Sequence, residues 1–141
     1  MKLARISLIF GLLLIFQSCG SGQVEENTKK RAEIIAVHDE VMPKMGQLKS
    51  LEKSALQKVE ELSAMDSVDS VQIEALKNLA LDLDKAYEGM FVWMRQYETE
   101  DGDQTPEEIK AYLDEQLILV MEVNKNMKTA LSKADSLLKI Q

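Results

Sequence analysis

Apolar residues recur every three or four positions over three long stretches of this chain, residues 29–64, 71–97 and 105–138. This spacing places side chains on one face of an α-helix. Each stretch therefore predicts a long amphipathic helix with a heptad-like apolar seam. In the middle stretch, for example, the predicted seam consists of Ile73, Leu76, Ala80, Leu83, Tyr87, Met90, Met94 and Tyr97.

The interruptions between and within these stretches are equally specific. Pro43 lies inside the first one, where it removes a backbone hydrogen bond and predicts a kink. Residues 65–70 (MDSVDS) supply a turn and several possible helix N-caps. Thr105, Pro106 and Glu108 stand at the N-cap, N1 and N3 positions of a capping box, which predicts that the third helix begins there.

Composition supports helices over sheet, because aromatic residues make up 5% of the chain and there are only two prolines and six glycines. Three helices of similar length with short connections fold most simply as an antiparallel up-down-up bundle. We therefore expect an all-α three-helix bundle with long helices over residues 29–141.

The first 18 residues have the features of a bacterial export signal. Lys2 and Arg5 precede an apolar segment, residues 6–16, that is too short to span a bilayer comfortably. The segment ends at Ser18-Cys19 and resembles a lipoprotein signal, in which the cysteine is lipidated and becomes the first mature residue. Cys19 is the only cysteine of the chain, which fits lipidation and excludes an internal disulfide.

Residues 20–28 (GSGQVEENT) are polar and glycine-rich, without helical periodicity. Together with Cys19 they predict a flexible, lipid-anchored tether over residues 19–28. We expect the protein to be anchored to a membrane of the bacterial cell envelope through this lipid, with the outer membrane favoured and the bundle facing the periplasm.

The net charge of −7 becomes about −9 once the export segment, with its two basic and no acidic residues, is removed. Such a surface repels phosphate backbones, so we expect no nucleic-acid partner.

The segment HDEVMPKMGQL (38–48), followed by a long helix and the later pattern M-x-x-W-M-x-x-Y (90–97), resembles small helical lipoproteins of Bacteroidetes, some of them labelled viral A-type inclusion protein. The resemblance covers most of the mature chain. It implies a helical envelope lipoprotein and brings neither an activity nor functional residues.

Helical spacing places one cluster of soft side chains on facing seams. His38, Met42 and Met45 share a face of the first helix, and Met90, Trp93 and Met94 lie on the second. The short connections predict that residues 38–45 lie beside residues 89–96 and residues 109–113, which adds Tyr97 and Tyr112 to the cluster. The cluster should then lie at the end of the rod nearest the lipid. Met121 and Met127 should lie further along as core residues.

This cluster has two interpretations. Methionine commonly fills irregular core space, especially near a proline kink, and the cluster is then packing alone. The alternative is a periplasmic soft-metal protein, in which His38, Met42, Met45, Met90 and Met94 bind Cu(I) or Ag(I) and Trp93 covers the ion as a cation-π cap.

The sequence does not favour an enzyme. It has one histidine, no cysteine besides Cys19, no Ser/His/Asp set and no glycine-rich phosphate loop. Asn124, a polar residue at a seam position, is expected to fix register rather than to bind a ligand. The favoured function is a non-enzymatic helical interaction or spacer module, without a cofactor, that contacts another envelope protein.

Overall fold

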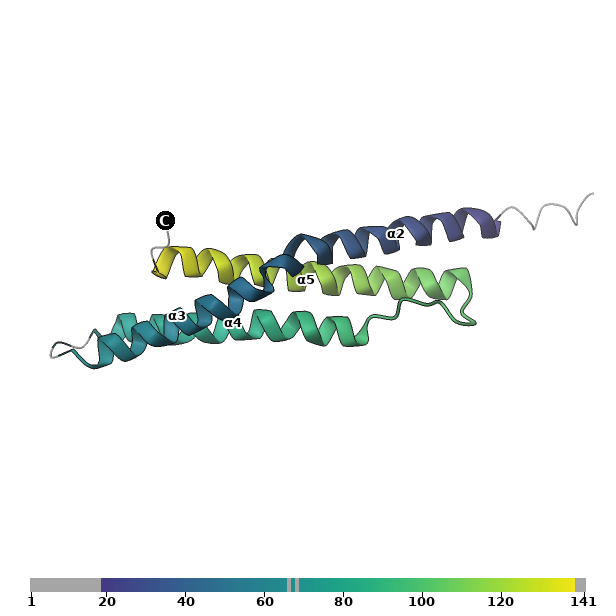
Figure 1. Cartoon of the computed structure of the whole chain (residues 1–141). Helices are drawn as coiled ribbons and strands as arrows, with labels where there is room; N and C mark the ends of the chain where they lie inside the picture. Colours follow the sequence, from purple (N-terminus) through teal and green to yellow (C-terminus); the bar gives the residue numbers. More distant parts are fainter. Residues whose placement is uncertain (1–18, 66, 68, 139–141) are drawn as a thin grey trace, which may run out of the picture.

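The computed structural model describes residues 19–65, 67 and 69–138, and the predicted signal peptide, residues 1–18, lies outside them. The described residues form an all-α three-helix bundle with up-down-up order and no strand, which confirms the predicted fold (Figure 1). The first arm contains α2 (Cys19–Val41), the 3₁₀ turn η2 (Met42–Lys44) and α3 (Met45–Ser63). The second arm is α4 (Ser70–Gln96), and the third is α5 (Pro106–Leu138).

The break in the first arm occurs at Pro43, as predicted. Proline has no N–H to offer the preceding turn, and the chain tightens into η2, where the N–H of Met45 bonds to the carbonyl of Met42. The break changes the partner of the arm. Before it α2 packs mainly along α5, and after it α3 packs mainly along α4 (Figure 1).

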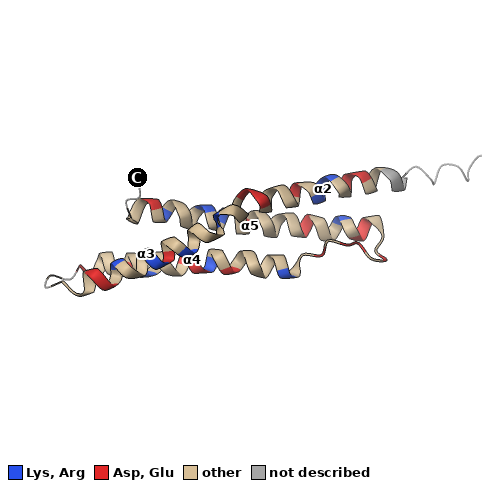
Figure 2. Cartoon of the chain, in the orientation of Figure 1, with Lys and Arg blue, Asp and Glu red and all other residues tan. Residues whose placement is uncertain are grey.

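Ion pairs between helices define their directions. Lys30 pairs with Asp114, and Glu40 pairs with Lys128, so α2 and α5 run parallel. Figure 2 shows acidic and basic residues distributed along all three arms.

The predicted register holds for the first two arms and fails for the third. His38 lies beside Met94, as expected. On α5, however, the residue next to this part of α2 is Asn124, which bonds to Val37, and residues 109–113 lie closer to the start of the helix. The loop of residues 97–105 does not turn tightly. It runs on past the end of α4 before α5 begins (Figure 1).

The helix ends follow the predicted capping chemistry. The carboxylate of Asp69 accepts a hydrogen bond of 3.0 Å from the N–H of Gln72 and caps α4. At the start of α5, the N–H of Thr105 donates to Glu108 Oε2 at 2.8 Å, and the N–H of Glu108 donates to Thr105 Oγ1 at 3.3 Å. This reciprocal pair is the predicted capping box.

The predicted tether is wrong, because residues 19–28 belong to α2. The helix continues there because Asn27 has an interhelical partner. Its side chain is only 6% exposed, and its Nδ2 donates a 2.8 Å hydrogen bond to the carbonyl of Pro106 on α5. The spacing of apolar residues did not predict this contact, because Asn27, the residue that packs here, is polar.

The core is a continuous column of apolar side chains from all arms. Its largest fully buried members are Ile34, Val41, Leu48, Leu76, Leu79, Leu83, Met90, Leu113, Val120 and Met127. Met127 is therefore a core residue, as predicted. Met121 is not, because its side chain is 56% exposed on the outer face of α5. No helix within the described part of the chain is both long and apolar enough to cross a membrane.

Candidate functional site

The candidate site lies where α2 ends and α4 passes beside it. His38 stands in the last turn of α2, five residues before the proline break. A basic side chain suits this position, because the carbonyl groups at a helix C-terminus carry partial negative charge. The site lies part-way along the bundle and not at its end, since α2 extends back to Cys19 and overlaps the start of α5 (Figure 1).

The imidazole of His38 has defined neighbours on three sides. Its Nδ1 is 2.8 Å from Asp39 Oδ1, and its Nε2 is 3.4 Å from the thioether sulfur of Met94. The Trp93 ring lies 5.5 Å from the imidazole, centre to centre, at a tilt of 35°. The side chain retains 16% of its accessible surface, so solvent reaches it.

The structure thus brings three of the six predicted residues together: His38, Trp93 and Met94. It places Met45 and Met90 in the apolar core, where their thioethers pack among other core side chains. Met42 is half-buried in η2 and packs against that core.

Trp93 begins an aromatic stack that leads away from His38 towards the loop. Its ring stacks on Tyr97 at 4.9 Å, and Tyr97 stacks on Tyr112 of α5 at 6.3 Å. The hydroxyl of Tyr112 accepts a 2.6 Å hydrogen bond from the N–H of Glu98, and burial raises the pKa of this phenol. The expected inclusion of Tyr97 and Tyr112 is therefore correct as a chain of contacts, although Tyr112 does not lie level with His38.

Arg31 holds the acidic loop onto this stack, a role the sequence did not suggest. Its guanidinium lies 6.0 Å from the ring centre of Tyr97 and donates a 3.0 Å hydrogen bond to the carbonyl of Glu98. It also forms an ion pair with Asp101. The loop carries four carboxylates in its sequence ETEDGD, and Arg31 offsets one of these charges and positions the loop.

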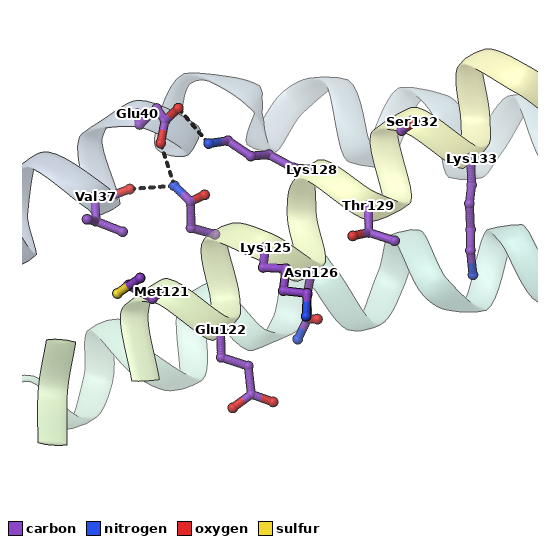
Figure 3. Close-up of a pocket in the computed structure, with 11 residues that line it drawn as sticks. Val37, Glu40, Met121, Glu122, Lys125, Asn126, Lys128, Thr129, Ser132 and Lys133 are labelled. Atoms are coloured by element: carbon purple, nitrogen blue, oxygen red, sulfur yellow. Dashed lines mark hydrogen bonds and ion pairs between the residues drawn. The ribbon is translucent and has the colours of Figure 1, made fainter. Parts of the chain in front are cut away.

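Asn124 fixes the contact between α5 and the end of α2, as its position in the seam predicted. Its Nδ2 donates 2.9 Å hydrogen bonds to the carbonyl of Val37 and to Glu40 Oε2 (Figure 3). Lys128 donates to the other oxygen of Glu40 at 2.6 Å. The bonds from Lys128 and Asn124 hold the pKa of Glu40 below its usual value. All these groups satisfy one another, which is the arrangement of a structural junction.

An open groove of about 950 Å³ runs beside this junction. It is lined mainly by α5, including Met121, Lys125 and Thr129, with Val37 and Glu40 from α2 at one edge (Figure 3). Figure 3 shows that the labelled lysines and Glu122 point in different directions and do not converge on one point.

Hard metal ions have no ready site here, since no group of three or more His, Cys, Asp or Glu side chains within residues 19–138, as far as they are described, could hold an ion. A site made of one imidazole and thioethers belongs to a different ligand class. No family model, curated protein or solved structure matches this chain.

Proposed function

We propose that this protein is a lipid-anchored helical strut of the bacterial cell envelope, a non-enzymatic spacer and interaction module. The lipid on Cys19 attaches it to the membrane, with the outer membrane favoured and the bundle in the periplasm. Its far end contacts another envelope protein.

The observation that carries the proposal is that α2 begins at Cys19 and continues, through the 3₁₀ turn at Pro43, into α3. The first arm has 23 residues in α2, 3 in η2 and 19 in α3. At ~1.5 Å per α-helical and ~2.0 Å per 3₁₀ residue, this arm is ~70 Å long. A lipid at the start of this arm is therefore joined directly to a stiff helical rod, without a flexible linker between them.

The far end of the rod has the character of a contact surface. The turn between α3 and α4 lies at the opposite end from Cys19 (Figure 1). Met65 and Val71 on either side of that turn are exposed apolar side chains. Between α2 and α5, the side chains of Glu40, Asn124 and Lys128 are engaged with one another.

The test measures distance from the membrane along the rod. The lipidated protein is placed in vesicles that contain an acceptor lipid, and a donor dye is attached at Ser67→Cys or, as a matched control, at Glu25→Cys. The thiol of an acylated Cys19 does not react with the dye. We expect efficient energy transfer from position 25 and little from position 67.

Equal transfer from both positions would mean that the rod lies flat or swings freely, and the strut proposal would then be rejected. Metabolic labelling with a fatty acid is the companion measurement. The wild type should be labelled and Cys19→Ser should not, and an unlabelled wild type refutes the anchor itself.

A further inference from the structure

His38 lies between two groups that both accept hydrogen bonds. The carboxylate of Asp39 faces Nδ1 at 2.8 Å, and the thioether of Met94 faces Nε2 at 3.4 Å. A carboxylate and a thioether have no proton to donate, and a neutral imidazole has only one N–H. When that N–H points to Asp39, the lone pair of Nε2 faces the lone pairs of the Met94 sulfur. In this tautomer both atoms present a lone pair and can bind one positive ion together.

We propose that this pair of donor atoms is a binding site for a soft monovalent metal ion, Cu(I) or Ag(I), with Nε2 of His38 and Sδ of Met94 as ligands. Imidazole and thioether are donors that soft ions prefer. The role of Asp39 agrees with this, because metal-binding histidines usually donate their other ring N–H to a carboxylate, which orients the ring. The proposal goes beyond the strut function and does not depend on it.

The separation of the two donor atoms suits one shared ion. With the zinc–nitrogen and zinc–sulfur lengths of ~2.0 and ~2.3 Å taken as a guide for Cu(I), atoms 3.4 Å apart subtend an angle of roughly 105° at the metal. That angle is close to tetrahedral and leaves room for a further ligand.

Met42 is the candidate for a third ligand. It follows His38 by four residues in the sequence and is half-buried in η2, whereas Met90 is fully buried in the core. Trp93 packs next to the imidazole and shields this side from water. The structure brings His38 and Met94 of the predicted ligands together, Met42 is the proposed third ligand, and Met45 and Met90 pack in the core.

A proton on His38 competes with the metal ion for the imidazole nitrogen. An imidazolium donates from both nitrogens and satisfies Asp39 and Met94 without a metal. The proton and the metal differ in what they require of Met94. A metal bond is lost when the sulfur is removed, whereas a histidine that is merely protonated keeps its stronger partner, Asp39.

Trp93 provides the readout, because it is the only tryptophan of the chain and lies at the site. Ag(I) is titrated into the full-length protein in detergent while the Trp93 emission is followed, and Cu(I) affinity is measured anaerobically against a chromophoric chelator. We expect one ion per chain, with a saturable change in emission. The measurement is repeated in Cys19→Ser, which must still bind, so that a free thiol cannot account for the result.

The variants separate ligation from packing. His38→Gln and Met94→Leu should each weaken binding more than 100-fold, and Asp39→Asn should weaken it ~10–100-fold, as other partners of metal-bound histidines do. Met127→Leu, which alters a core methionine on another helix, should leave affinity unchanged. Helix content by circular dichroism shows that each variant is folded. Absence of binding by the wild type, or equal affinity of folded Met94→Leu and Met127→Leu, overturns the proposal.

Discussion

Two methionines six residues apart on α5 should respond in opposite ways to the same truncation. Met127 is fully buried, whereas Met121 is 56% exposed. Met127→Ala removes three heavy atoms from a packed column and leaves a cavity, which costs ~2–5 kcal/mol for a buried methionine. Met121→Ala removes side-chain atoms that largely face water. Its effect should stay within ~0.5 kcal/mol, helped by the better helix propensity of alanine.

The assay is urea unfolding at pH 7, followed by the helical circular dichroism signal. A domain of this size has a total stability of ~5–15 kcal/mol, so the loss expected for Met127→Ala is a large share of it. At ~4 °C per kcal/mol, the melting temperature should fall by ~8–20 °C. Met127→Leu is the matched control, because it conserves volume and should cost less than ~1.5 kcal/mol.

An equal loss of stability in Met121→Ala and Met127→Ala would refute the orientation of α5 described here. It would mean that both methionines face the core, as the sequence suggested. A loss below ~1 kcal/mol in Met127→Ala would equally contradict its complete burial.

Three further changes test the helix end and the loop. Thr105→Ala removes the hydroxyl of the capping box and should cost ~0.5–2 kcal/mol in urea unfolding. The bonds from Thr105, first its N–H and then its hydroxyl, lower the folded-state pKa of Glu108. The stability that this carboxylate contributes is therefore present above its unfolded pKa of ~4.5 and is lost as pH falls through the lower folded value. Glu108→Gln should make unfolding less pH-dependent between about pH 5 and pH 3, and an unchanged pH dependence would contradict the cap. Arg31→Met should release the loop and speed amide hydrogen exchange at residues 98–104, with the core of α4 still protected; unchanged exchange would show that Asp101 and Tyr97 hold the loop without the cation.

The six residues expected to form the site show how far the sequence could go. Spacing along a helix placed His38 and Met42 on one face, and the length of the turn after α3 placed that face beside Trp93 and Met94. These are local quantities. Whether Met90 points at His38 or into the core depends on the rotation of α4 about its axis, which the packing of α3 and α5 against it decides. The sequence therefore predicted the correct region of the bundle, but it assigned more residues to the site than the structure brings together.

Polar residues account for most of what the sequence missed. Asn27 and Arg31 interrupt no apolar pattern, so nothing in the chain marks them as contacts. Each acquires its role from a partner on another helix, Pro106 for one and the loop carboxylate of Asp101 for the other. A polar contact between helices depends on two groups that are distant in the sequence. The pattern of residues within one stretch therefore does not predict it.

The sequence by itself determined the helices, their order, the break at Pro43 and the caps at Asp69 and Thr105, because hydrophobic spacing, the missing proline N–H and side-chain caps act within a few residues. Only the tertiary structure decided where α2 begins and how far α5 is displaced along the bundle. The loop of residues 97–105 extends along the rod and shifts α5 by several turns relative to a tight connection. This shift sets Asn124 against the end of α2.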